Sequence, residues 1–227
     1  MNIIEPYARM LDVVGLSEGI VLLKKIEWAG RISHRSEEAQ TADSWERFIR
    51  AVVLGHGDWS IVEHASVSVD MMVDRGITHE IVRHRLFSFT QESTRFVNYE
   101  KKMPPSFIVP FDEETGKMEC HQDGSTVRGC WEMVIKDVEW AYKSLLEKIP
   151  PQIARSVFPN SLASRIIITG NLRNWRHFLL MRTTKEAHPQ MRQVTIPLLA
   201  EFQAKIPILF EDIEPNGRQV TNIAKGR

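Results

Sequence analysis

Arginine, histidine and hydroxyl side chains are concentrated between residues 83 and 95, which read Arg-His-Arg-Leu-Phe-Ser-Phe-Thr-Gln-Glu-Ser-Thr-Arg. Arginine guanidinium groups and small hydroxyls are suited to binding phosphate groups and flat polar rings. Apolar residues flank these charges, among them Ile81, Leu86, Phe87 and Phe96. We therefore expect this segment to lie against a hydrophobic core, and not to form a solvated basic stretch.

The order and spacing of these side chains form a known signature. Its fixed positions are Arg83, His84, Arg85, Ser88, Ser93 and Arg95. The pattern resembles the motif of flavin-dependent thymidylate synthases, and it contains none of the glycines of phosphate-binding or dinucleotide-binding loops. The resemblance covers most of the chain and is densest at 55–97 and 150–192.

The resemblance implies an α/β (α+β) fold in which helices surround an antiparallel sheet. It implies a homotetramer whose active sites draw residues from several subunits. The activity implied is that of an FAD-dependent methyltransferase that converts dUMP to dTMP. Methylenetetrahydrofolate would donate the carbon, and FAD reduced by NADPH would donate the hydride that completes the methyl group.

The resemblance also assigns roles to individual side chains. The flavin would be held by Ser60, Arg83, His84, Arg85, Gln91, Asn171, Arg173 and His177. The nucleotide would be bound by Glu80, Arg83, Gln91, Glu92, Ser93, Thr94, Arg95, Arg155 and Arg182. Three positions depart from common family residues: Glu80 stands for a glutamine, Gln91 for a glutamate and Glu186 for a histidine.

Arg182 is the expected catalytic residue. Carbon 5 of uracil is a poor nucleophile, and neither Cys120 nor Cys130 lies in a candidate site segment. A positioned arginine can favour loss of the ring's amide proton and so make carbon 5 electron-rich. Ser93 as a covalent nucleophile is the alternative, although no histidine is evidently placed as its base.

Histidine and cysteine spacings do not predict a metal site. His79 and His84 are five residues apart, whereas a zincin helix needs histidines four apart so that both face one metal. The histidines that flank Asp58 are interpreted as loop and capping residues. The two cysteines fit no zinc pattern and no disulfide framework, and they are interpreted as incidental thiols.

Composition narrows the class of protein. The chain has 227 residues, 43% of them hydrophobic, which suits a single domain over 1–227. Its 29 basic and 29 acidic residues balance, so the chain has no net positive charge that would favour binding to nucleic acid or to a membrane surface. Without an apolar run of membrane length or a signal-like N-terminus, we expect a cytoplasmic protein. A non-enzymatic nucleotide- or RNA-binding protein is the runner-up, which the neutral charge weakens.

Hydrophobic periodicity predicts the elements that position these side chains. Helices are expected at 16–31, 41–54, 76–85, 127–148 and 171–182, strands at 65–73 and 166–169, and loop with strand at 87–97. Pro197 is expected to interrupt the helix after residue 182. Residues 100–125 are expected to form a surface excursion, and the tail after 215 to be loosely held.

Two helical stripes are expected on 171–182. Asn171, Trp175, Phe178 and Arg182 share one stripe, since eleven residues make three turns plus about 20°. Arg173 and His177 form a neighbouring polar pair. A further arginine, Arg155, stands between apolar neighbours and is expected to need an anionic partner.

Overall fold

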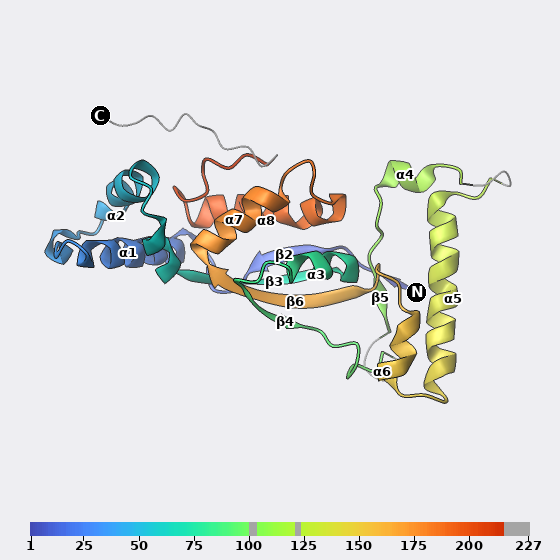
Figure 1. The fold of residues 1–227 in the computed structure, drawn as a ribbon. Helices are drawn as coiled ribbons and strands as arrows, with labels where there is room; N and C mark the ends of the chain where they lie inside the picture. Colours follow the sequence, from blue (N-terminus) through green and yellow to red (C-terminus); the bar gives the residue numbers. More distant parts are fainter. Residues whose placement is uncertain (100–103, 121–123, 216–227) are drawn as a thin grey trace. The chain divides into compact units, whose positions relative to one another are not determined.

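The computed structural model describes residues 1–99, 104–120 and 124–215 (Figure 1). The strands are β1 (Asn2–Ile3), β2 (Tyr7–Met10), β3 (Ser66–Asp74), β4 (Ser88–Gln91), β5 (Ser106–Phe107) and β6 (Ala163–Asn171). The α-helices are α1 (Leu16–Ile32), α2 (Ser44–Phe48), α3 (Arg75–Ile81), α4 (Glu113–Lys117), α5 (Val127–Leu146), α6 (Pro151–Ala154), α7 (Leu172–Arg182) and α8 (Pro189–Lys205). The remaining helical segments are the π-helix η2 (Ile49–Gly55) and three 3-10 helices, η1 (Glu37–Ala39), η3 (Trp59–His64) and η4 (Arg155–Val157).

The contacts of the chain gather into two compact units. The first unit comprises Met1–Tyr7, Met72–Arg83 and Thr90–Ile166. The second unit comprises Ala8–Met71, His84–Phe89 and Ile167–Arg227. The boundary falls inside the signature, between its first arginine and its histidine.

A four-stranded sheet has the order β2-β3-β6-β4. The amide of Leu172, just after β6, donates to the carbonyl of Ala65, just before β3. At the opposite ends of the strands, the amide of Arg75 donates to the carbonyl of Leu162. The two strands therefore run antiparallel with one register throughout, and the expected mixture of helices with an antiparallel sheet is confirmed.

Strand β3 begins and ends within one residue of its prediction, but it does not have the expected solvent-facing side. Asp70 is completely buried, and its Oδ2 accepts hydrogen bonds of 3.2 and 3.0 Å from Nε and Nη2 of Arg9. The strand lies between β2 and β6, so both of its edges are paired, and the neighbouring strand β2 supplies Arg9. A buried carboxylate of this kind needs its cation, because an isolated charge in a core is very costly.

The helix predictions hold for α1, α5 and α7 and fail in part elsewhere. The expected helix at 41–54 begins at Ser44 and continues as the π-helix η2. Helix α3 ends at Ile81 and does not reach the signature arginines. Helix α8 runs through Pro197 without interruption, because its buried side chains Val194, Leu198 and Phe202 hold both halves in the core.

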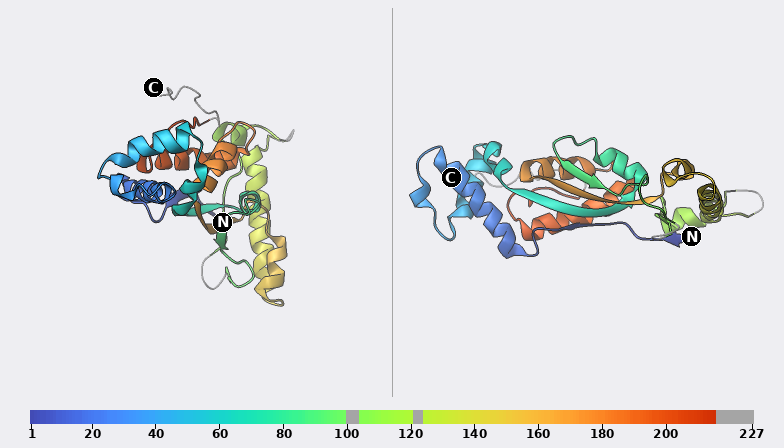
Figure 2. Two further views of the ribbon diagram at one scale, coloured as in Figure 1. Left: turned by 60° about the vertical axis from the view of Figure 1, so that its left-hand side comes forward. Right: turned by 90° about the horizontal axis from the view of Figure 1, so that it is seen from below.

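The first unit has its own apolar clusters. Figure 2 shows α5 and α6 side by side, and Tyr99, Tyr142 and Ala154 form a buried cluster there. The predicted excursion at 100–125 is more ordered than expected: β5 pairs in parallel with β1, and Phe107 is fully buried. Residues 100–103, 121–123 and the predicted loose tail at 216–227 lie outside the described residues.

The interpretation of the two cysteines as incidental thiols is wrong in this structure. Cys120 and Cys130 are paired as a disulfide ten residues apart in the chain. Cys130 lies in α5, close to the cap at which Thr126 accepts from the amide of Gly129. No framework of several bridges exists, since the chain has two cysteines.

In the second unit, α1 and α7 each pack on α8 and on η3. Gly19 of α1 lies so close to the end of α8 that an added Cβ would stand 1.6 Å from the carbonyl oxygen of Lys205. Arg176 of α7 is buried and forms an ion pair with Asp212. None of the described helices is long and apolar enough to cross a membrane.

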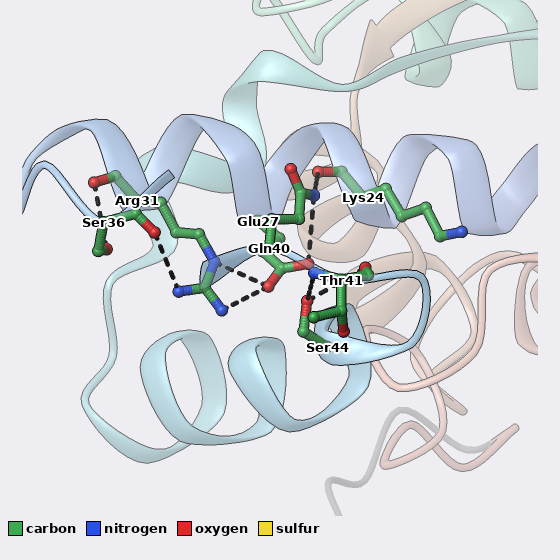
Figure 3. A network of polar contacts seen from close by, with 7 residues as sticks. All are labelled: Lys24, Glu27, Arg31, Ser36, Gln40, Thr41 and Ser44. Atoms are coloured by element: carbon green, nitrogen blue, oxygen red, sulfur yellow. Dashed lines mark hydrogen bonds and ion pairs between the residues drawn. The ribbon is translucent and has the colours of Figure 1, made fainter. Parts of the chain in front are cut away.

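A buried carboxylate ties α1 to the turn that follows it (Figure 3). Oε1 of Glu27 accepts hydrogen bonds from Nε and Nη2 of Arg31 at 2.8 and 2.7 Å, and Oε2 accepts from Gln40 at 3.2 Å. Gln40 also donates to the carbonyl of Lys24. Glu27 is fully buried, so these bonds replace the water that its charge would otherwise need.

Replacing Arg31 by methionine should destabilise the protein by about 3–5 kcal/mol, because the buried Glu27 charge would lose its partner. Urea denaturation at pH 7 measures the loss. The control is Lys117→Met, which breaks a pair with Glu113 of the same helical spacing, 74% and 81% exposed, and should change stability by under about 0.5 kcal/mol. Equal effects of the two variants would contradict this account of the network.

Candidate active site

Helix α7 carries the second group of candidate residues, and Asn171 fixes where it begins. Oδ1 of Asn171 accepts from the amide of Asn174 at 2.9 Å, which caps the first turn. The apolar members of the expected stripe, Trp175 and Phe178, are fully buried. Arg182 follows on the same stripe as the last residue of the helix, and the predicted stripe is confirmed.

Phe87 of the signature is inserted against this helix. Its ring meets Trp175 edge-on at 4.8 Å between centroids and Phe178 at 6.0 Å. A Cβ at Gly170 would stand 2.4 Å from the Phe87 ring, so the glycine makes room for it. Asn174 completes the attachment by donating to the carbonyl of Leu86 at 3.1 Å.

The apolar neighbours of the signature are only partly buried. Ile81 and Phe87 lie in the core as expected. Leu86 and Phe96 are 79% and 75% exposed in this chain, which corrects the expectation that all these residues face a core. Arg95 lies over the ring of Phe96, 5.1 Å from its centroid, which is a favourable arrangement for a cation.

The second signature residue meets the last residue of α7. Nε of Arg182 donates a hydrogen bond of 2.9 Å to Nε2 of His84. The imidazole also packs edge-on against Phe178, with ring centroids 4.8 Å apart. The structure therefore brings together two residues that the sequence placed 98 positions apart.

The environment of His84 favours its neutral form. Burial is the first cause, and the positive charges of Arg182 and His177 add to it, so that the pKa of His84 falls to about 4. A neutral imidazole can accept a hydrogen bond at one nitrogen and donate at the other. His84 is therefore available as an acceptor at neutral pH.

The remaining candidates for flavin contact in the second unit lie at the surface. Ser60 of η3, Arg85 and His177 are exposed. Arg173 is exposed as well and forms an ion pair with Glu63 of η3 at 2.6 Å. Glu186 is exposed, and hydrogen bonds from its own backbone and from Thr184 lower its pKa.

The nucleotide candidates of the first unit converge on a tight turn after β4. Oγ of Ser93 accepts from the amide of Arg95 at 3.3 Å. Thr94 is buried, and its hydroxyl accepts from Nη1 of Arg155 at 2.9 Å. Nε of Arg95 donates to Gln152 at 3.2 Å, so the turn is joined to α6.

A pocket of about 510 Å³ adjoins this turn. It is lined by Arg75, Thr94, Gln152, Ile153, Arg155, Ser156, Phe158 and Leu162. Sequence reasoning missed Arg75 and Ser156, which add a second guanidinium and a second hydroxyl. The signal for Arg75 was its position between the predicted strand at 65–73 and the predicted helix at 76–85 that leads to the signature.

Arg155 is exposed, although it stands between apolar neighbours in the sequence. Its side chain is exposed at η4 and donates to the neutral hydroxyl of Thr94. The expected anionic partner of Arg155 stays a prediction; of the apolar residues beside it, Ala154 is buried, whereas Ile153 is 53% exposed. An exposed guanidinium at a pocket is suited to an anionic ligand.

Four other predicted residues of the first unit serve the local structure. Nε2 of Gln91 donates to the hydroxyls of Thr78 and Ser164, each at 3.0 Å. Oε1 of Glu92 accepts from Tyr99 at 2.8 Å, and burial followed by this bond raises the pKa of the Tyr99 phenol. Glu80 and Arg83 lie at the end of α3, where the amide of Arg83 donates to the carbonyl of Glu80.

Phe87→Ala should destabilise the protein by about 3–5 kcal/mol, because it empties the space between Gly170 and the α7 rings. Leu86→Ala is the matched control in the same segment and should cost under about 0.5 kcal/mol, since Leu86 is exposed. Thermal and urea unfolding of both variants measure the difference. A Phe87→Ala protein as stable as the control would show that this contact does not anchor the signature.

Comparison with known sequences places these residues in a family. The family described as thymidylate synthase complementing protein matches residues 22–208. A flavin-dependent thymidylate synthase of Corynebacterium aurimucosum is 33% identical over 223 residues, covering 93% of this chain and 85% of the relative. Another, from Mycobacterium sp. strain JLS, is 34% identical over 204 residues, covering 83% and 79%.

Comparison with solved structures supports the fold. The crystal structure of the UMP/dUMP methylase PolB from Streptomyces cacaoi, bound with 5-Br dUMP, covers 93% of this chain and 96% of its own with a TM-score of 0.73. Its sequence identity is 22%, so the likeness concerns the fold. From the family match and the curated relatives, this chain belongs to the family of the flavin-dependent thymidylate synthases.

Proposed function

We propose that this chain is a flavin-dependent thymidylate synthase that methylates dUMP at carbon 5 to give dTMP. One observation carries the proposal beyond family membership. The hydrogen bond from Arg182 to His84 joins the two regions to which the resemblance assigns the chemistry, the signature and the helix α7. An arginine held in this way is a fixed positive charge, which is what activation of a uracil ring requires.

The surface of the second unit is chemically suited to a flavin. Arg85 and His177 are exposed donors, and Ser60 adds a small hydroxyl. We propose that these residues hold the FAD together with His84, Asn171 and Arg173 of the same unit, and the resemblance adds Arg83 and Gln91 to the set of flavin ligands. When bound, the flavin supplies the hydride that completes the methyl group. Cationic side chains around a flavin also favour its anionic reduced form.

The pocket of the first unit is suited to the phosphate of a nucleotide. Arg75 and Arg155 offer two guanidinium groups, and the hydroxyls of Thr94 and Ser156 lie among the lining residues. Charge-assisted hydrogen bonds from arginine forks are the strong form of phosphate recognition. We propose that Ser93, Arg95 and Arg155 bind the dUMP phosphate, as the resemblance implies, and that Thr94 and Arg75 belong to this set.

Arg182 would act on the pyrimidine. Its charge favours loss of the proton from the ring's amide nitrogen, and the resulting anion places electron density on carbon 5. The step needs no covalent addition to the ring, and neither Cys120 nor Cys130 lies in a candidate site segment. Ser93 would serve as a ligand and not as a nucleophile, because no histidine bonds its hydroxyl among the described residues.

The finer parts of the proposal follow from the resemblance. Methylenetetrahydrofolate would donate the carbon, and NADPH would be the reductant of the flavin. The protein would be a cytoplasmic homotetramer whose sites are shared among subunits. A symmetric assembly lets each subunit contribute part of several sites.

Arg182→Ala should lower the rate of dTMP formation by about 10²–10³, because a preorganised charge is lost from the transition state. Flavin absorbance per subunit should stay near the wild-type value. The control is Lys185→Ala, which removes an exposed cation three residues further on and should keep its turnover. Near-normal turnover of Arg182→Ala would refute its catalytic role, and a wild-type protein that takes up no flavin would refute the flavin-dependent reaction.

Mixing the inactive variants Arg83→Ala and Arg182→Ala under conditions of subunit exchange should partly restore activity. If the two residues serve one site from different chains, some mixed sites carry both wild-type side chains. Turnover of the mixture, compared with each variant treated alone, measures the effect. No recovery after exchange has been proved by mass would place both residues in one chain's site, and a fully active monomer would overturn shared sites.

A further inference from the structure

We propose that His84 is a positioning residue for Arg182: its neutral imidazole accepts a hydrogen bond from the guanidinium and thereby fixes where the positive charge points. The inference rests on the proposed function, which places Arg182 beside the pyrimidine. It gives His84 a role separate from contact with the flavin.

The geometry determines the tautomer of the imidazole. Nε of Arg182 always carries a proton, so Nε2 of His84 must accept the bond of 2.9 Å that joins them. The proton of the neutral ring then lies on Nδ1. A doubly protonated ring would turn this contact into one between two donors and two positive charges.

The acceptor is itself held by rigid neighbours. His84 packs edge-on against Phe178 at 4.8 Å and near Phe87 at 6.4 Å between ring centroids. Both phenylalanines belong to the aromatic core around Trp175. The position of Nε2 is therefore set by packed side chains and not by a mobile loop.

The other end of Arg182 is fixed by a neighbouring helix. The hydroxyl of Thr195 in α8 donates to the carbonyl of Arg182 at 2.8 Å. Thr195 is fully buried. The backbone of Arg182 is thus held by α8 and its Nε by the signature, which defines the direction of the terminal guanidinium nitrogens. Misplacement of a reacting group by about 1 Å can cost 10²-fold in rate.

The electrostatics agree with the geometry. The charged and titratable groups that act on His84 are Arg182 and His177, both from α7. Together with burial, they lower the pKa of His84 to about 4, so the accepting form persists at neutral pH. The positive charge of Arg182 would oppose any role of His84 as a positive charge.

Two variants separate the acceptor from the ring. His84→Phe keeps an aromatic ring between Phe178 and Phe87 but removes the acceptor. His84→Gln loses the ring but offers an amide oxygen near the place of Nε2. We expect kcat of His84→Phe to fall at least about tenfold with flavin absorbance retained, and His84→Gln to recover most of that loss, as for a positioned catalytic group.

The pH dependence of stability gives a readout that does not use the reaction. Between pH 6.5 and about 4, the unfolded histidine binds a proton that the folded one does not, so its contribution to stability falls as pH falls. His84→Gln lacks this group. The Tm of the wild-type protein minus that of His84→Gln should therefore decrease between pH 7 and pH 5.

The outcomes are distinct. A kcat of His84→Phe equal to that of wild type, or a Tm difference that is constant with pH, overturns the positioning role. Loss of flavin absorbance in both variants would reduce the role of His84 to the proposed contact with the flavin, and it would overturn the positioning role as well. A wild-type protein that binds flavin and dUMP but forms no dTMP contradicts the proposed function, and the Tm difference then still decides whether His84 is the neutral acceptor.

Discussion

The packing of the Phe87 ring against α7 is the contact that places the signature residues of the second unit. β6 has a glycine at the one point where a side chain would collide with this ring, and α7 presents Trp175 and Phe178 to its other faces. Because the ring can lie in one place only, the residues beside it in the chain are placed too. His84 then reaches Arg182, and the carbonyl of Leu86 reaches Asn174.

Several candidate residues serve the fold as well as the site. Asn171 caps α7, Thr94 accepts from Arg155, and Gln91 joins two buried hydroxyls. Each of these hydrogen bonds holds the polar side chain in one of the orientations that it could otherwise adopt. Functional side chains held in this way lose little freedom when a ligand arrives, which is the physical meaning of a preorganised site. The cost is that a substitution at such a position changes stability and binding together.

Much of this fold could be predicted from the sequence, and the failures have physical reasons. The periodic apolar positions of α1, α5 and α7 define those helices, because a buried stripe dominates their stability. Pro197 misled the prediction for α8, since local propensity is weaker than burial of the helix on both sides of the proline. The solvent-facing side predicted for β3 failed at Asp70, because alternation within one strand cannot reveal that the neighbouring strand supplies Arg9 as the partner of this carboxylate.

Some of the site residues could likewise be predicted from the sequence, and others could not. Spacing alone identified the signature and the stripe that ends at Arg182, but it could not reveal that His84 and Arg182 touch. Nor could it find Arg75, whose place beside Arg155 depends on how β3 and the segment before β6 pair. Long-range pairing of this kind carries no local pattern, and it becomes visible only in three dimensions.

The most direct test of the account follows one carbon atom. The purified protein is supplied with dUMP, NADPH and methylenetetrahydrofolate labelled with carbon-13 in its methylene group, and the nucleotide product is examined by mass spectrometry. The account predicts dTMP that carries the label in its methyl group, formed only when the protein holds flavin. Labelled dTMP from protein stripped of flavin, or no labelled dTMP from flavin-loaded protein, would contradict it.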